Sequence, residues 1–65
     1  PEVGTAGTAT TELRPSGKVR VDRKTYDAIT SGEHIQRGET IQVTGTRGSS
    51  LVVAAYSGDD EASDG

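Results

Sequence analysis

Cysteine, tryptophan, phenylalanine and methionine are all absent from this 65-residue chain, and His34 is its single histidine. Without cysteine the fold cannot be held by disulfides, and one histidine cannot supply the ligand set of a structural zinc site. Apolar residues make up only 29% of the chain, so a core of Val, Ile, Leu, Ala and Tyr must be thin. A chain of this size then needs a closed sheet or a partner for its stability.

Long apolar runs are also missing. No stretch approaches the ~20 apolar residues that cross a bilayer as a helix, and no basic segment followed by an apolar run indicates a signal peptide. The chain begins at Pro1 without an initiator methionine, so we expect it to be part of a longer protein. Its length accommodates one small domain.

Negative charge is concentrated at the C-terminus. The net charge is −3, but the last seven residues contain four of the ten carboxylates: Asp59, Asp60, Glu61 and Asp64. Without these four, seven cations face six carboxylates, and the rest of the chain is nearly neutral. Small, polar and charged segments bury too little apolar surface to fold. We therefore expect a folded domain over residues 1–57 and a disordered acidic tail over residues 58–65.

Apolar and polar residues alternate along most of the chain, and no helical periodicity competes with this pattern. Alternation places every second residue of a strand on the same face. It predicts five short strands whose inward residues are Ala9, Thr11 and Leu13; Val19 and Val21; Tyr26 and Ala28; Ile41 and Val43; and Leu51, Val53 and Ala55. The segment 30–40 is predicted to be a loop anchored by Ile35.

Gly, Pro and Ser mark the connections between these strands. Arg14–Gly17 is predicted to be a turn, because Pro presets φ and Gly accepts a positive φ, and Arg47–Ser50 is predicted to be another. Arg23 and Lys24 are predicted to connect the second and third strands. Positive φ is expected at Gly17, Gly32, Gly38 and Gly48.

Short strands joined by tight turns are typical of an all-β barrel or sandwich. Closing the sheet removes the exposed edges that so short a sheet would otherwise present. We predict a small five-stranded OB-like Greek-key barrel, with an SH3-like barrel as the alternative.

Positive charge gathers around the second predicted strand, at Arg14, Lys18, Arg20, Arg23 and Lys24. OB folds bind single-stranded nucleic acid through cationic grooves with stacking aromatics, so a nucleic-acid-binding module is the alternative function. Tyr26 is predicted to face inward, however, and Asp22 and Asp27 dilute the positive charge. The candidate partner contacts, chosen by outward orientation or loop position, are Arg14, Lys18, Arg20 and Arg37.

Motifs for catalysis, metals and cofactors are absent from the sequence. The serines lie in turn-rich segments, and no G-x-S-x-G elbow accompanies His34, which is predicted to be an exposed loop residue. No G-x-G-x-x-G or P-loop pattern occurs. We therefore predict a protein that is not an enzyme and has no metal, cofactor or small-molecule substrate.

A longer series of residues keeps a characteristic order and spacing between positions 7 and 53. It consists of Gly7-x-Ala9-x-Thr11-x-Leu13-Arg14-Pro15-x-Gly17-x-Val19, Val21, Tyr26-Asp27-Ala28, Ser31-Gly32-Glu33, Ile35-x-x-Gly38, Ile41-x-Val43 and Gly48-x-x-Leu51-x-Val53. This series resembles the soluble C-terminal domain of NfeD-type proteins. One departure is Arg23-Lys24, where the family often has a Gly-containing turn.

The resemblance implies an OB-fold barrel that belongs to a membrane-anchored parent protein and acts as a non-enzymatic interaction module. It implies a stomatin- or flotillin-type membrane scaffold protein as the partner. A membrane serine protease is a second candidate partner, since longer members of the family carry a Clp-like protease domain. The expected localisation is membrane-associated, through the parent protein.

Overall fold

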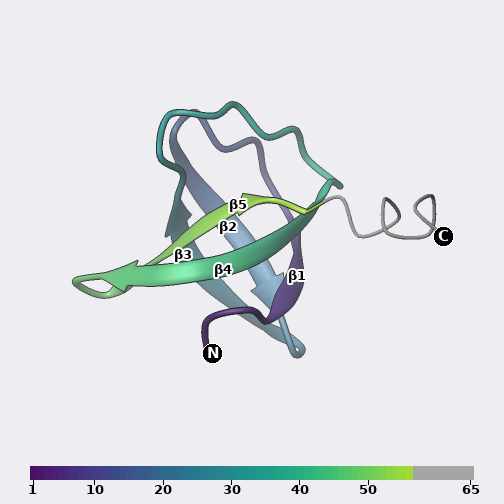
Figure 1. Cartoon of the computed structure of the whole chain (residues 1–65). Helices are drawn as coiled ribbons and strands as arrows, with labels where there is room; N and C mark the ends of the chain where they lie inside the picture. Colours follow the sequence, from purple (N-terminus) through teal and green to yellow (C-terminus); the bar gives the residue numbers. More distant parts are fainter. Residues whose placement is uncertain (57–65) are drawn as a thin grey trace, which may run out of the picture.

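Five strands form one closed barrel in the computed structural model, which describes residues 1–56. The strands are β1 (Ala6–Ala9), β2 (Ser16–Val21), β3 (Lys24–Ile29), β4 (Thr40–Arg47) and β5 (Ser50–Ala55) (Figure 1). No helix occurs among the described residues. The predicted all-β class and five-stranded barrel are confirmed. Residue 57 and the expected acidic tail over residues 58–65 lie outside the described residues.

The strand order around the barrel is β1-β2-β3-β5-β4, and β4 pairs back to β1. Strands β1, β2 and β3 follow one another in antiparallel order, and β3 pairs with β5 in parallel. Strands β4 and β5 form an antiparallel hairpin that extends beyond the barrel (Figure 1). Closure pairs strand edges that an open sheet of this size would leave exposed.

Ten apolar residues fill the barrel as one buried cluster: Ala9, Leu13, Val19, Val21, Ala28, Ile35, Ile41, Val43, Leu51 and Val53. Tyr26 is half-buried and packs against this cluster. The inward positions predicted for the second to fifth strands are confirmed except for Ala55, which is exposed at the end of β5. Thr30 is buried, and its hydroxyl donates a hydrogen bond to the carbonyl oxygen of Glu33 at 2.7 Å, so this buried polar group has a hydrogen-bond partner.

The first strand is shorter than the alternation predicts. It ends at Ala9, and the N–H groups of Thr10 and Thr11 both point to the carbonyl oxygen of Lys18, at 2.9 and 3.4 Å. Two residues therefore oppose one, which interrupts the alternation of faces as a bulge does. Thr11 is exposed, contrary to its predicted inward position. Leu13 is fully buried, but it reaches the core through an isolated bridge with Ile35 and not through a continuous strand.

Gly17 does not occupy a turn with positive φ, contrary to the prediction. It lies within β2, directly opposite Ala28 of β3. Glycine is needed there for space: a Cβ would lie 2.6 Å from Leu13 Cδ2 and closer still to the carbonyl oxygen of Glu12. The chain after β1 thus packs directly against the backbone of β2.

The turn between β2 and β3 is formed by Asp22 and Arg23, one residue earlier than predicted, and Lys24 already belongs to β3. The φ angles of Asp22 and Arg23 are 58° and 72°. Two consecutive positive φ angles are the geometry of a type I′ turn, whose twist matches that of the flanking strands. Elsewhere the predicted positive φ is confirmed at Gly32, Gly38 and Gly48.

Val21→Asp is expected to unfold the domain, whereas Arg20→Ala is expected to leave it folded. Val21 is 1% exposed, and Arg20 points outward at the neighbouring position. A buried carboxylate without a partner costs free energy on the scale of the whole stability of a domain, ~5–15 kcal/mol. Two-dimensional ¹H–¹⁵N NMR spectra of both variants check this. A native spectrum for Val21→Asp would show that the inward face of β2 is wrongly assigned.

Gly17→Ala is expected to lower the free energy of unfolding by ~1–3 kcal/mol, because the added methyl meets backbone and a buried side chain. Gly45→Ala is the matched control, since a Cβ on this β4 glycine meets no heavy atom within 4 Å. Its effect should stay below ~1 kcal/mol. Urea denaturation of both variants gives the comparison, and equal losses would contradict the close approach at Gly17.

Candidate partner-binding surface

Two loops meet at one end of the barrel. The β1–β2 connection, residues 10–15, and the β3–β4 loop, residues 30–39, are joined where Leu13 and Ile35 pair in antiparallel fashion. The N–H of Leu13 donates to the carbonyl oxygen of Ile35 at 2.8 Å, and the N–H of Ile35 donates back at 3.1 Å. Both side chains are fully buried. The predicted role of Ile35 as the anchor of its loop is confirmed.

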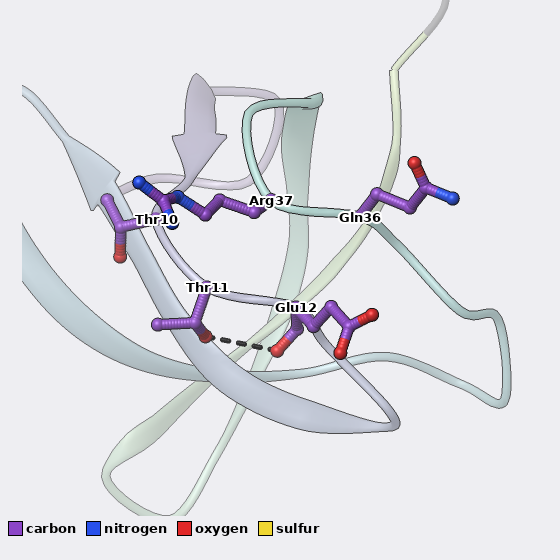
Figure 2. Close-up of a pocket in the computed structure, with 5 residues that line it drawn as sticks. All are labelled: Thr10, Thr11, Glu12, Gln36 and Arg37. Atoms are coloured by element: carbon purple, nitrogen blue, oxygen red, sulfur yellow. Dashed lines mark hydrogen bonds between the residues drawn. The ribbon is translucent and has the colours of Figure 1, made fainter.

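An open groove runs between these two loops and is lined by Thr10, Thr11, Glu12, Gln36 and Arg37 (Figure 2). The Thr11 hydroxyl accepts the Lys18 N–H at 3.0 Å and donates to the carbonyl oxygen of Glu12 at 3.0 Å, which fixes this wall of the groove to β2. The Arg37 side chain extends from the opposite wall toward Thr10 (Figure 2). The groove therefore combines hydroxyl groups, one carboxylate and one guanidinium.

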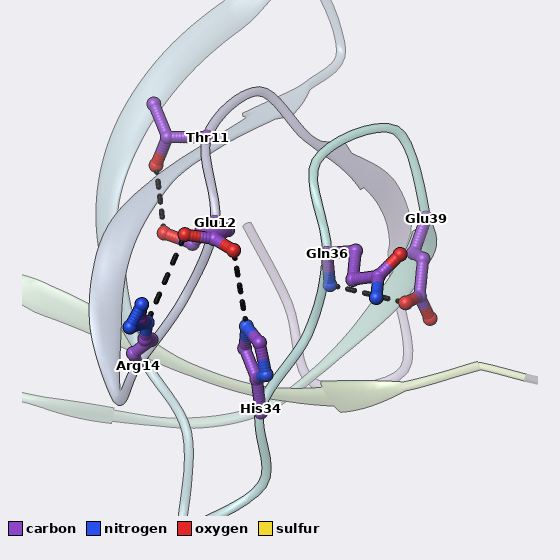
Figure 3. Close-up of polar contacts among 6 residues, drawn as sticks. All are labelled: Thr11, Glu12, Arg14, His34, Gln36 and Glu39. Carbon is purple, nitrogen blue, oxygen red and sulfur yellow. Dashed lines mark hydrogen bonds and ion pairs between the residues drawn. The ribbon is translucent and has the colours of Figure 1, made fainter.

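Glu12 connects the two loops through its carboxylate (Figure 3). Its Oε1 lies 3.7 Å from Arg14 Nε, and its Oε2 lies 3.3 Å from His34 Nε2. The side chains of these pairs are about half exposed, so water screens both contacts and each contributes ~1 kcal/mol or less. Glu39 is also engaged, because its Oε2 accepts the Gln36 N–H at 3.0 Å.

Lys18 and Arg20 both point outward from β2, but their surroundings differ. Lys18 Nζ lies 2.7 Å from Oδ1 of Asp27, its partner on β3. Arg20 lies between Thr8 of β1 and Thr25 of β3, which carry no charge. The turn at Asp22 and Arg23 decides this difference through the β2–β3 register. A turn one residue later would place Arg20, and not Lys18, opposite Asp27.

All four candidate residues are exposed, as the sequence predicts. The structure does not gather them at one point: Arg14 and Arg37 lie on different loops, and Lys18 and Arg20 lie on the barrel wall. The acidic partners of Arg14 and Lys18 are not evident from the sequence, since the first depends on the local conformation of the β1–β2 connection and the second on the β2–β3 register. Their role in partner binding therefore stays a prediction.

Within residues 1–56 no three His, Cys, Asp or Glu side chains are arranged to hold a metal ion. In that range the His34 ring makes its polar side-chain contact with Glu12. No helix in the described part of the chain is long and apolar enough to span a membrane.

These observations define the class of protein: a small closed β-barrel whose charged and polar groups lie on an exposed wall and two joined loops. The chain belongs to the NfeD family, because residues 2–54 match the NfeD-like C-terminal, partner-binding domain. The resemblance seen over residues 7–53 is thereby confirmed. A comparison with curated proteins gave no match.

Two solved structures are similar to this chain. The C-terminal domain of stomatin operon partner protein 1510-C from Pyrococcus horikoshii has a TM-score of 0.81 and 28% sequence identity, over 85% of this chain and 88% of that chain. The soluble domain of a membrane protein implicated in regulation of membrane protease activity from Corynebacterium glutamicum has a TM-score of 0.76 and 22% identity, over 85% and 92%. The barrel is thus the OB fold of NfeD C-terminal domains.

Ile35→Ala is expected to lower the free energy of unfolding by ~2–5 kcal/mol, because Ile35 is completely buried and its loop has no strand of its own. Ile29→Ala removes the same atoms from a half-buried position and should cost less than ~1.5 kcal/mol. Thermal unfolding monitored by circular dichroism compares the two. Equal losses would show that Ile35 does not anchor the loop.

Proposed function

We propose that this barrel is a non-enzymatic interaction module of a membrane-anchored NfeD-type protein, and that it binds a stomatin- or flotillin-type scaffold protein. The observation that carries the proposal is the match of residues 2–54 to a partner-binding domain. The Pyrococcus relative is a stomatin operon partner protein, which supports a stomatin-type partner. The Corynebacterium structure is the soluble domain of a membrane protein implicated in regulation of membrane protease activity, which supports membrane anchoring and a membrane protease as a further partner.

The physical basis of binding would be a rigid surface. A closed barrel fixes the backbone from which its outward side chains project, so little backbone conformational entropy is lost when a partner docks. Exposed cations at Arg14, Lys18, Arg20 and Arg37 would contribute electrostatic complementarity, which raises association rates and sets orientation more than it adds affinity. The half-exposed charges of the Glu12 contacts can rearrange at small cost when a partner approaches.

Nucleic-acid binding is supported less well by the same surface. Single strands are held by aromatic stacking as well as by positive charge. Tyr26, the aromatic residue on β3 nearest the cations of β2, packs against the core. Tyr26 is therefore not available for stacking beside these cations, and the other tyrosine, Tyr56, which is 42% exposed, lies beyond the end of β5 and not on β2 or β3.

The test is calorimetric titration of the full-length chain with the soluble part of a stomatin-type protein from the same organism. Saturable binding is expected, with an affinity that falls as salt rises, because charged contacts between exposed groups are screened. A single-stranded oligothymidylate serves as the parallel titrant and is expected to bind weakly or not at all. Tight binding of the oligonucleotide without binding of the scaffold protein would overturn the proposal.

A further inference from the structure

The four candidate cations fall into two pairs by their ionic contacts. Arg14 and Lys18 each face a carboxylate of the same chain, Glu12 and Asp27. Arg20 and Arg37 form no salt bridge with any carboxylate among residues 1–56. Within residues 1–56, a carboxylate of a bound protein would have to displace an existing ionic contact at Arg14 and Lys18, but not at Arg20 and Arg37.

Arg20 lies beside the outer face of β1. Its partner across the ladder is Thr8, whose own partner on the other side is Thr40 of β4. Adjacent strands lie ~4.8 Å apart, so Arg20 and Thr40 flank Thr8 at about one strand spacing on either side. The outward side chains in this row are small and carry hydroxyl groups, which leaves the guanidinium as the single charge.

Arg37 belongs to the β3–β4 loop and lies next to the end of β1. The N–H of Gly38 donates to the carbonyl oxygen of Ala9 at 2.8 Å, and the N–H of Ala9 donates to the carbonyl oxygen of Glu39 at 2.9 Å. These two hydrogen bonds hold the loop against the end of β1, and the Arg37 side chain extends toward Thr10 (Figure 2). Arg20 and Arg37 therefore approach the outer face of β1 from opposite sides.

This surface, called the β1 face below, consists of Thr8, Thr10, Arg20, Arg37 and Thr40. The acidic residues beside it already hold other groups: Glu12 contacts Arg14 and His34, and Glu39 accepts the Gln36 N–H. The β1 face thus has two guanidinium groups and three hydroxyl groups, and the exposed Tyr56 lies at its edge, where the Tyr56 N–H donates to the carbonyl oxygen of Thr40 at 3.0 Å.

We infer that the β1 face binds an extended acidic segment of the protein partner, with carboxylates on Arg20 and Arg37, an inference that rests on the proposed function. Arginine pairs with carboxylates through two parallel N–H···O bonds, which fixes both distance and orientation. The hydroxyls of Thr8 and Thr40 can donate to the remaining carboxylate oxygens or to backbone carbonyls of the bound segment, whereas the Thr10 hydroxyl already donates to the Lys18 carbonyl oxygen at 3.1 Å. The residues next to the two guanidinium groups, Thr8 and Thr10, offer hydroxyls and no aromatic ring, which favours a peptide over a nucleic-acid strand.

The test uses a synthetic peptide of alternating Glu and Ser as the probe, titrated into the ¹⁵N-labelled full-length chain and followed by NMR. Saturable shifts are expected at the amides of Thr8, Thr10, Arg20 and Arg37. Arg20→Gln/Arg37→Gln should weaken binding about tenfold or more, the loss expected when two charge-assisted contacts disappear. The matched control is Arg23→Gln/Arg47→Gln, which removes the same charge from the β2–β3 turn and from the end of β4 and should weaken binding less than about threefold.

Equal weakening by both double variants would overturn the inference, because it would show that only the net charge matters. Tighter binding of an oligothymidylate at the same residues would overturn it in favour of a nucleic-acid site. Titration with the stomatin-type protein distinguishes the failure of this inference from the failure of the proposed function. If it binds the wild type and Arg20→Gln/Arg37→Gln equally, the β1 face is refuted and the proposed function stands. If it fails to bind while the peptide gives the expected pattern, the proposed function is refuted and the β1 face stands.

Discussion

Leu13 and Ile35 exchange two backbone hydrogen bonds across the end of the barrel, and both side chains are buried without residual exposure. Residues 30–39 contain no strand or helix, and loops of this length rarely hold one conformation unless they are anchored. The pairing supplies that anchor, and the hydrogen bonds between Ala9 and the segment Gly38–Glu39 extend it to β1. The position of Arg37 therefore depends on a contact between two loops that lie more than twenty residues apart in the sequence.

Strand register, as much as composition, determines which of the exposed cations are paired with carboxylates of the same chain. Lys18 is paired with Asp27 and Arg14 with Glu12, so half of the exposed candidate cations are already compensated within the chain. Among residues 1–56, Arg20 and Arg37 have no ionic partner, and they lie beside β1, whose exposed residues Ala6 and Thr8 are small and uncharged. A partner-binding domain of this size has little apolar surface to offer, because its apolar residues are needed in the core. Recognition through charge and hydroxyl groups on a rigid sheet is the physical alternative.

The barrel could be predicted from the sequence because alternation fixes which strand residues face the core, and Val19, Val21, Ile41 and Val43 are all buried as predicted. The exposure of Thr11 could not be predicted from alternation, because the N–H groups of Thr10 and Thr11 share the Lys18 carbonyl oxygen and interrupt the alternation after Ala9. The turn at Asp22 and Arg23 was not predictable either: a turn one residue later would also leave Val19, Val21 and Ala28 inside. The position of this turn determines whether Asp27 neutralises Lys18 or Arg20. The sequence alone therefore does not predict which cations of the candidate surface are paired.

The most direct test of where the partner binds is NMR cross-saturation in a complex of the deuterated, ¹⁵N-labelled chain with the unlabelled soluble part of a stomatin-type protein. Saturation transfers only to amides at the interface, so it maps the contact without altering any charge. The strongest signal loss is expected at Thr8, Thr10, Arg20 and Arg37. Signal loss confined to the β4–β5 hairpin, residues 44–50, with no loss at the β1 face, would contradict the placement of the partner-binding surface.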